Sequence, residues 1–442
     1  VYNYAHIGNL RSFICADILK RWLIYKGFKV KHVMNITDVD DKTIRDSQKQ
    51  NISLKEFTRK YEKAFFEDLN KLNIIKPDIT PRATEHIDDM VSVIQTLLEK
   101  GYAYHGEDGS IYFSIKKFPD YGKLAGLDLD KLKPTAQISE DEYSKEDARD
   151  FALWKAWTEK DGDVYWETPL GKGRPGWHIE CSTMSSKYLG IPFDIHTGGV
   201  DLIFPHHTNE IAQAEAATGK KFVNYWVHIE HLIVDNKKMS KSLGNFYTLR
   251  DLLEKGYSSK AIRYILMSTH YRKQLNFTLS GLEQAEKTVK GLLDFMHKIK
   301  TIELFGDYNQ GFKVHLDELK KKFEEYMDDD LNMPQALAIV FEIIKETNKA
   351  IEEKHGDNDK LTSISTENLR EVYKLMKEID KVLGILEEEE EEIPKEIIDL
   401  AEKRQEARKK KDFETADKIR EQIKSKGYLI EDTSSGYRIR KA

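Results

Sequence analysis

The stretch from Trp177 to Glu210 limits most strongly how this chain can fold, because its metal-binding side chains have to converge in space. Cys181 can supply a thiolate, His206 an imidazole and Glu210 a carboxylate. His206 and Glu210 are four residues apart, a spacing that places two side chains on one face of a helix. Zinc accepts sulfur, nitrogen and oxygen donors together, and a site with only three protein ligands leaves a position for substrate. We therefore predict a reactive zinc site.

A simpler interpretation of the same residues is open, because a lone cysteine is usually a small buried apolar residue and Pro-His-His is often a polar loop before a helix. The distribution of histidine favours the metal. Six of the 14 histidines lie within 54 residues, which core packing does not explain: His178, His196, His206, His207, His228 and His231.

The composition sets wider limits. With 442 residues, 40% of them hydrophobic and 33% charged, the chain is long enough for about three domains, and it has no apolar stretch of membrane-spanning length. A net charge of -6 restricts any contact with nucleic acid to local patches. The two cysteines, Cys15 and Cys181, cannot form a disulfide framework, and no secretory signal is visible, so we expect a reducing, cytoplasmic location.

The first residues predict a loop that leads into a helix. VYNYAHIGN is polar and contains Gly8, and the apolar residues from Leu10 to Tyr25 keep helical spacing until Gly27. The N-terminus of such a helix offers backbone N–H groups and a positive dipole end, so together with His6 it suits a polyphosphate.

The next segment, KVKHVMNITD, predicts a strand that ends in polar residues. Thr37, Asp38, Asp40 and Asp41 lie at its carboxyl end. In open α/β sheets, ligands bind at the carboxyl ends of strands. We therefore expect this edge of the sheet to border a ligand.

The sequence DNKKMSKSLGN predicts a mobile loop whose lysines can close on phosphate groups. It contains the motif Lys238 to Ser242. A solvated basic loop without a ligand is the alternative, as it is for most short charge runs.

Together these motifs resemble the cysteinyl-tRNA synthetases, a family of class I aminoacyl-tRNA synthetases. HIGN at His6 to Asn9 resembles the HIGH signature, and KMSKS at Lys238 to Ser242 matches its signature letter for letter. Other stretches are similar to the family in the same order, over essentially the whole chain: NITDVDDK, PRATEHI, GWHIECS, FPHHTNEIAQ and MDDDLNMPQAL.

The resemblance implies a role for particular residues. It makes Cys181, His206 and Glu210 zinc ligands, and places Thr37, Trp177 and His196 around the cysteine substrate, with His196 and His178 near its ionised thiol. It assigns the chemistry on ATP to His6, Gly8, Asn9, Lys238 and Lys241.

Two positions depart from the family pattern. The last histidine of the HIGH signature is Asn9 here, which keeps a polar side chain but has no imidazole. The family has a further zinc cysteine, which we expect upstream of Val1, because Cys15 falls within the first predicted helix.

The implied reaction is the ATP-dependent attachment of cysteine to its tRNA through a cysteinyl-adenylate, with zinc recognising the substrate thiol and magnesium accompanying ATP. The implied enzyme is a monomer without membrane contact. A cysteine ligase of the mycothiol ligase type, with an amino-sugar acceptor, is an alternative, but those relatives lack the tail formed here by residues 393–442. An RNA-binding paralogue without catalysis is a third possibility, and the KMSKS lysines and zinc ligands count against it.

We expect an α/β fold in which a Rossmann-type parallel-sheet catalytic domain is split by an insertion and followed by a helical bundle and a small C-terminal domain. The two catalytic halves would be 1–80 and 173–250, and the insertion 81–172, with a hairpin in GYAYHGEDGSIYFSI. The helical domain would be 251–386, bounded by the glutamate run 387–392. The acidic strip from Glu140 to Asp150 reads as a solvated face.

The tail 393–442 reverses the sign of the charge, with 14 lysine and arginine residues against 10 aspartate and glutamate residues. Much of the positive charge lies in KRQEARKKKDF, which we expect on one helix. An ordinary lysine-rich surface helix is the alternative. The position of this tail resembles the anticodon-binding domain of the family, although the tryptophan found near the end of that domain is Ile439 here.

Overall fold

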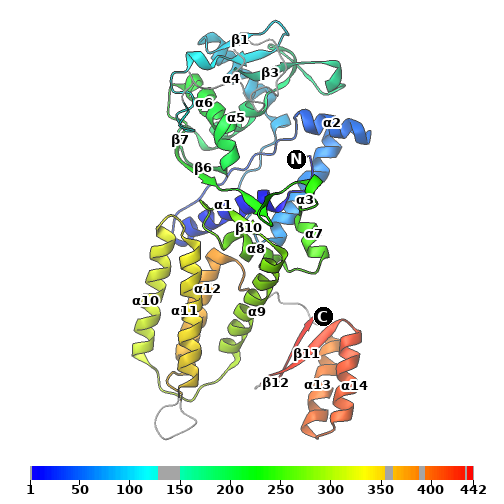
Figure 1. Ribbon diagram of the computed structural model, residues 1–442, viewed down its shortest axis with the longest axis vertical. Helices are drawn as coiled ribbons and strands as arrows, with labels where there is room; N and C mark the ends of the chain where they lie inside the picture. The colour runs from blue at the N-terminus through cyan, green and yellow to red at the C-terminus, as the bar shows by residue number, and fades with distance from the viewer. Residues whose placement is uncertain (1, 128–149, 354–361, 388–393, 434–435, 442) are drawn as a thin grey trace. The chain divides into compact units, whose positions relative to one another are not determined.

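The computed structural model describes residues 2–127, 150–353, 362–387, 394–433 and 436–441. The chain forms two compact units (Figure 1). The first consists of Val1–Val289, Phe323–Ala338 and Lys381–Ile385, and the second of Lys290–Lys322, Ile339–Asp380 and Leu386–Ala442. Within the described residues, no helix combines the length and the apolar character that crossing a membrane requires.

The first helix, α1 (Ile7–Tyr25), forms where the apolar spacing predicts it. Ile7, Leu10 and Ile14 are wholly buried, and Gly27 ends the helical turn with a φ of +87°, which favours glycine. Three helices follow in the same half of the chain: α2 (Asp41–Gln50), α3 (Leu54–Lys71) and α4 (Ile87–Glu99).

The prediction of a regular strand in KVKHVMNITD is wrong in its detail. The segment is extended, but it pairs only through two isolated parallel bridges, Val33 with Ile79 and Ile36 with Arg82. Pro81 lies in the partner segment and has no N–H group, so it can only accept, from the N–H of Ile36. The missing N–H of Pro81 interrupts the parallel hydrogen-bond ladder between the two segments, but the pairing continues on both sides of it.

Residues 103–175 carry a five-stranded antiparallel sheet in the order β1-β2-β3-β5-β4. The predicted hairpin is confirmed as β1 (Ala103–His105) and β2 (Ile111–Phe113). The other strands are β3 (Phe151–Ala156), β4 (Trp166–Thr168) and β5 (Gly171–Pro175). The acidic strip that we expected as a solvated face lies, apart from Asp150, outside the described residues.

The chain returns to parallel pairing after β5. Helix α5 (Trp177–Leu189) leads to β6 (Phe193–Gly199), and after α6 (Thr208–Thr218) the strand β7 (Val223–Ile229) pairs with β6 in parallel. A second parallel pair joins β8 (Leu232–Val234) to β10 (Leu275–Phe277), with the short β9 (Lys237–Lys238) antiparallel to β8. Helices α7 (Leu249–Glu254) and α8 (Ser259–Met267) lie between β9 and β10 in the sequence. The predicted α/β class is therefore confirmed, but the parallel sheet is built in separate pieces.

Four long helices follow: α9 (Leu279–Thr301), α10 (Gln310–Asp328), α11 (Met333–Glu352) and α12 (Thr366–Leu383). The second unit contains most of them, and α10, α11 and α12 lie side by side (Figure 1). The apolar face predicted for α11 is buried at Ala336, Ile339, Val340 and Ile343 and half-buried at Ile344. The predicted bundle is therefore confirmed.

The described tail contains two helices and a hairpin: α13 (Lys395–Lys409), α14 (Phe413–Ser425), β11 (Tyr428–Thr433) and β12 (Gly436–Lys441). Its core is formed by Ile397, Ala401, Ile423 and Ile430. Ile439 pairs with Ile430 across the hairpin and packs against this core. The basic run does not fill one helix, because α13 ends at Lys409 and the chain turns through Lys411, whose φ is +60°. Residues 388–392 of the glutamate boundary lie outside the described residues.

Candidate functional site

The three predicted zinc ligands come together in the first unit. Cys181 lies near the start of α5, His206 in the short helical turn η6 (Ile203–His207), and Glu210 in the first turn of α6. Their ligand atoms all lie within 4.8 Å of one another. Glu210 is 0% exposed and His206 4%, whereas Cys181 is half-buried. The cluster is thus largely buried.

Close backbone packing fixes the start of α5. A Cβ atom on Gly176 would lie 2.1 Å from the carbonyl oxygen of Ala152 in β3, so only glycine fits where β5 runs into the helix. Farther along, the hydroxyl of Ser182 donates to Oε1 of Gln213 over 2.7 Å, which ties α5 to α6. These contacts hold the helix of Cys181 against the helix of Glu210.

Glu210 meets an imidazole at each carboxylate oxygen. Nε2 of His206 lies 3.1 Å from Oε1, and Nε2 of His196 lies 3.1 Å from Oε2. Burial alone would raise the pKa of Glu210, but the two imidazoles hold it well below its ordinary value. The carboxyl group is therefore ionised at neutral pH.

The surroundings of this carboxylate fit a metal ion. Within the described residues, Oε1 of Glu210 is buried and accepts no hydrogen bond, although the ring nitrogen of His206 is close. Burial raises the pKa of the Cys181 thiol well above its ordinary value, and Glu210 and Glu180 add to this effect, while Asn35 opposes it. A divalent cation would give the carboxylate of Glu210 a partner and would lower the pKa of the Cys181 thiol, because a bound metal attracts both ligands in their ionised forms. The donor set of sulfur, nitrogen and oxygen suits zinc.

Contacts at the ring nitrogen that faces away from Glu210 hold His206 in one orientation. Its Nδ1 lies 2.8 Å from Nδ1 of His178, and the ring of Trp177 packs on it with centroids 4.1 Å apart. Burial lowers the pKa of His178 well below its ordinary value, so this imidazole is neutral and its Nδ1 can accept a hydrogen bond from Nδ1–H of His206. The structure therefore places His178 against the predicted zinc ligand His206, whereas the role beside the substrate thiol stays a prediction.

A second group of ligand type shares Glu210: His196, His207 and Glu210 also lie within 4.8 Å of one another. Nδ1 of His207 lies 2.9 Å from Nε2 of His228, and Trp226 stacks on His196. Burial lowers the pKa of His207 to about 2 and that of His228 to about 4, so both rings are neutral. The motif analysis gave His207 and His228 no role, and only the crowding of histidines in the sequence pointed to them.

Two of the residues predicted to line the cysteine pocket contact a predicted zinc ligand, and the third, Thr37, is linked to one through Asn35. Trp177 packs on His206 and is 46% exposed, and His196 faces Glu210. Thr37 reaches the cluster through Asn35, whose side-chain nitrogen contacts both Oγ1 of Thr37 at 3.5 Å and Sγ of Cys181 at 3.4 Å. Sequence reasoning missed Asn35, although its position two residues before Thr37 on an extended segment places both side chains on one face.

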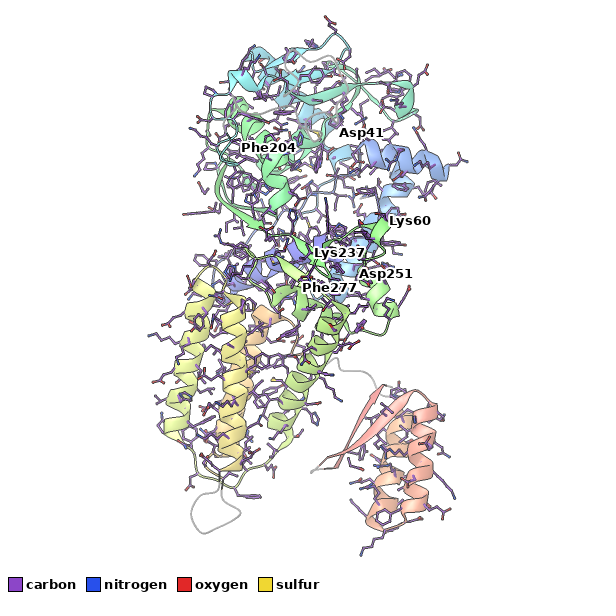
Figure 2. All side chains as sticks on the ribbon, in the orientation of Figure 1. Asp41, Lys60, Phe204, Lys237, Asp251 and Phe277 are labelled. Atoms are coloured by element: carbon purple, nitrogen blue, oxygen red, sulfur yellow. The ribbon has the colours of Figure 1, made fainter. Side chains whose placement is uncertain are left out.

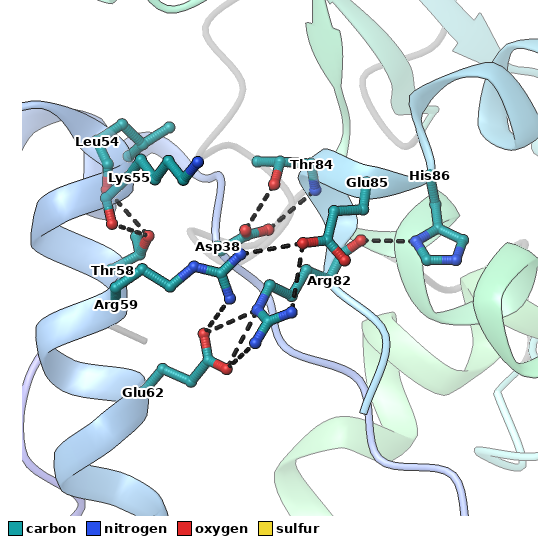
Figure 3. A network of polar contacts seen from close by, with 10 residues as sticks. All are labelled: Asp38, Leu54, Lys55, Thr58, Arg59, Glu62, Arg82, Thr84, Glu85 and His86. Atoms are coloured by element: carbon teal, nitrogen blue, oxygen red, sulfur yellow. Dashed lines mark hydrogen bonds and ion pairs between the residues drawn. The ribbon is translucent and has the colours of Figure 1, made fainter. Parts of the chain in front are cut away.

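A polar network anchors the end of this extended segment (Figure 3). The carboxylate of Asp38 accepts hydrogen bonds from the backbone N–H and the hydroxyl of Thr84, at 2.9 and 2.6 Å. Arg82 pairs with the half-exposed Glu85 and with the buried Glu62, which it contacts through two guanidinium nitrogens. The PRATEHI motif thus holds the residues that follow Thr37 in place.

The HIGN motif forms the start of α1. His6 accepts a hydrogen bond at Nδ1 from the backbone N–H of Asn9 (3.2 Å), and the amide oxygen of Asn9 accepts from the N–H of His6 (3.4 Å). The N–H of Ile7 donates to the carbonyl of Tyr247. Two of the first N–H groups of α1 are therefore occupied, which leaves a smaller phosphate-binding end than the sequence predicts. Burial lowers the pKa of His6, and Asp201 partly offsets this effect.

The KMSKS segment lies beside HIGN. His6 forms an isolated bridge with Thr248, and a Cβ atom on Gly8 would lie 3.5 Å from Cε of Met239 and 3.0 Å from the ring of His6. Lys238 is exposed in β9, and Lys241 begins the short turn η7 (Lys241–Leu243), with its side chain outside the described part.

Contacts on both sides hold this loop in place. The side chain of Asn245 bonds the backbone N–H of Ser240 and the carbonyl of Lys238. Lys237 in β9 and Phe277 in β10 (Figure 2) pair with Val234 of β8 from its two sides. The two signature motifs therefore share one place in the fold.

The chain matches two known family models. Residues 1–287 match the family described as "tRNA synthetases class I (C) catalytic domain", and residues 322–387 match the DALR domain. The first match covers more than half of the chain and contains the HIGN motif, the predicted zinc ligands and the KMSKS loop.

Curated relatives are similar over the full length of the chain. A cysteine–tRNA ligase of Chlamydia felis is 49% identical over 448 residues, covering 100% of this chain and 92% of the relative. The enzyme of the same name from Brachyspira hyodysenteriae is 48% identical, covering 99% of this chain and 92% of the relative. Among solved structures, a methionyl-tRNA synthetase of Mycobacterium tuberculosis bound by methionyl-adenylate has a TM-score of 0.66 at 13% identity, covering 87% of this chain and 90% of that one. This last likeness shows the fold alone.

Proposed function

Because the chain belongs to the cysteine–tRNA ligase family, we propose how its own residues carry out that reaction. The enzyme attaches cysteine to the tRNA for cysteine at the expense of ATP. Its substrates are therefore L-cysteine, ATP and tRNA. The proposal concerns the site residues, the metal and the parts of the chain that receive each substrate.

The cysteine substrate is recognised at the metal cluster. The observation that carries this proposal is the convergence of Cys181, His206 and Glu210 within 4.8 Å in a buried part of the catalytic unit. A bound zinc ion would supply a soft Lewis acid that coordinates a thiolate in preference to a hydroxyl. Shape alone separates close analogues poorly, by about 1–3 kcal/mol per methylene, so a site that must reject serine gains from such a group.

Three side chains line the pocket around that cluster. Trp177 offers a half-exposed ring next to His206, and Thr37 a hydroxyl next to Asn35. Nε2 of His196 faces the carboxylate of Glu210, and the His196 ring stacks on Trp226. The two contacts hold His196 beside the predicted zinc ligands. In this proposal these residues orient the amino acid and keep water from its thiol, since they reach the cluster from α5, from β6 and from the extended segment of Thr37.

ATP is bound between the HIGN and KMSKS motifs. His6, Gly8 and Asn9 form the start of α1, and Gly8 leaves room for the ring of His6, from which a Cβ atom would be only 3.0 Å away. Lys238 and Lys241 supply positive charge where negative charge develops on the phosphates, with magnesium accompanying ATP. Fixed donors of this kind lower the barrier electrostatically while the cysteine carboxylate attacks the α-phosphate.

The remaining parts of the chain receive the tRNA. Residues 1–80 and 173–250 form the catalytic halves in this proposal, 81–172 the insertion, 251–386 the helical domain and 393–442 the anticodon-binding domain. The basic residues of α13 and of the turn after it support the last assignment, since phosphate contacts require local positive charge. We further propose that the enzyme works as a monomer in the cytoplasm, where tRNA is charged for translation.

Cobalt in place of zinc tests the metal assignment. Addition of cysteine to the cobalt-loaded protein should produce a new thiolate-to-metal charge-transfer band, and serine should produce none, because only sulfur donates in this way. Cys15→Ala is the matched control: Cys15 packs in the core with Ile229 and Tyr271, and burial raises its pKa to about 11. The control should give the same band as the wild type. A cobalt spectrum that cysteine leaves unchanged would contradict direct coordination.

A further inference from the structure

Asn35 is a polar neighbour of the metal cluster that the proposed reaction does not use. Its side-chain nitrogen Nδ2 lies 3.4 Å from Sγ of Cys181 and 3.5 Å from Oγ1 of Thr37. Asn35 therefore bridges a ligand of the proposed zinc site and a wall of the proposed cysteine pocket.

The backbone holds this amide in place. The N–H of Met34 donates to the carbonyl of Ile79, and the N–H of Ile36 donates to that of Pro81. Ile36 is 2% exposed, so it fixes one face of the extended segment in the core. Alternation then turns Asn35 and Thr37 together toward α5, where Cys181 lies.

The sulfur of Cys181, once ionised, is stabilised by a hydrogen-bond donor. A metal-bound thiolate has only lone pairs to offer, and Glu180 and Glu210, two wholly buried carboxyl residues, lie next to it in sequence and in the cluster. An amide nitrogen carries two hydrogens, so Asn35 can donate to the sulfur and to Thr37 at once. A hydrogen bond to the sulfur stabilises its lone pairs and thus limits how much charge it gives to the metal.

We propose that Asn35 is a positioning residue of the zinc site, whose amide orients the Cys181 thiolate and draws electron density from it. The metal then keeps the Lewis acidity needed to accept a second thiolate, that of the substrate. This inference rests on the zinc site proposed above and adds to it a residue that acts through Cys181.

Two substitutions separate the hydrogen bond from the charge. Asn35→Leu keeps the branched arrangement of heavy atoms and removes both amide hydrogens, and Asn35→Asp keeps the shape but puts a carboxylate against the sulfur. Asn348→Asp is the matched control in α11, where the Asn348 amide oxygen accepts from Nζ of Lys298 over 2.8 Å, a contact that aspartate retains. Circular dichroism checks that each variant is folded.

The readouts are the cobalt spectrum without substrate and the zinc affinity in competition with a chelator. In Asn35→Leu, the band from the Cys181 sulfur to cobalt should move to lower energy, because the sulfur lone pairs are no longer stabilised. In Asn35→Asp, the zinc affinity should fall by about 10–100-fold, the usual effect of losing an outer-shell partner. A folded variant that no longer binds either metal also supports the proposal. Asn348→Asp should match the wild type in both measurements.

The possible failures are distinguishable. If the wild type shows the band and both Asn35 variants keep its energy and the zinc affinity, Asn35 has no such role and the zinc site stands. If the wild type itself shows no thiolate-to-cobalt band, the zinc site and the role of Asn35 are both overturned.

Discussion

Gly198 illustrates how little space the side chains around the metal cluster have. A Cβ atom at this position would lie 2.6 Å from Cε1 and 3.0 Å from Nε2 of His207. Since His207 also contacts His228, its ring cannot move without breaking that contact. The glycine is therefore required by packing against a histidine.

Gly198→Ala should displace His207 and with it the imidazoles around Glu210. We expect at least a tenfold loss of zinc affinity, measured by chelator competition, because outer-shell contacts of this kind change affinity by about 10–100-fold. Gly291→Ala is the control: a Cβ atom there meets nothing within 4 Å, and in the middle of α9 alanine should add about 0.5–1 kcal/mol of stability. Unchanged zinc binding in Gly198→Ala would show that the cluster tolerates a moved His207.

Lys241→Ala should slow adenylate formation much more than it weakens cysteine binding. The expected cost is about 2–4 kcal/mol in the transition state, as for other lost charge-stabilising donors. ATP–pyrophosphate exchange measures the rate, and its dependence on cysteine concentration measures binding. Lys255→Ala, which removes an exposed lysine after α7, should have no effect. An exchange rate equal to that of the wild type would remove Lys241 from the mechanism.

At the scale of single elements, long helices could be predicted and the metal site only in part. The apolar spacing of α1 and α11 sets both the helix and its buried face, so the sequence is sufficient there. The segment before Thr37 carries a strand pattern, but its pairing depends on Pro81, far along the chain. Asn35 and His228 reach the cluster only through tertiary packing, which no spacing within one element reveals.

Asp432 ties the hairpin of the tail to α13 through ion pairs with Arg404 and Arg408, and the strength of these pairs depends on pH. Both terminal nitrogens of Arg404 donate to the carboxylate of Asp432, at 2.8 and 3.0 Å. These hydrogen bonds lower the pKa of Asp432 below its ordinary value. Arg404 is 1% exposed, so it would be left buried without its partner.

Asp432→Asn should therefore destabilise the tail by about 1–2 kcal/mol at pH 7, less than for a fully buried pair because Asp432 is 40% exposed. A depressed native pKa stabilises the folded state above the unfolded value, about 4, and this stability is lost as the pH falls through the native pKa. The difference between variant and wild type should thus shrink below pH 4. Hydrogen exchange of α14 at each pH measures the stability of the tail in the variant and in the wild type. A stability difference that stays constant down to pH 2 would contradict the ion pair.

The basic end of α13 and the turn after it should contact tRNA and not the small substrates. Reversing the charge of Lys409, Lys410 and Lys411 should leave ATP–pyrophosphate exchange near normal. It should weaken tRNA charging and make its salt dependence shallower, because fewer phosphates are neutralised. Reversing Lys345 and Lys349 in α11 is the control for general charge effects. If charging is unaffected by the first set, the basic run is only a solvated surface.

Across the whole molecule, the two signature motifs and the predicted zinc ligands lie in the first unit, although residues 103–175 separate the HIGN motif from the other two in the sequence. The motifs and the metal-ligand types could be recognised from the sequence because each is short and chemically distinct. How the α/β sheet is divided into separate parallel pairs could not, since that depends on which segments meet in space.

Cysteine-dependent ATP–pyrophosphate exchange, measured before and after removal of zinc, tests the central claim most directly. The zinc-loaded protein should exchange with cysteine and not with serine, lose this activity when a chelator removes the metal, and regain it when zinc is returned. Exchange that persists with cysteine in protein shown to be free of metal, or that proceeds equally well with serine, would contradict the claim that a metal held by Cys181, His206 and Glu210 selects the substrate.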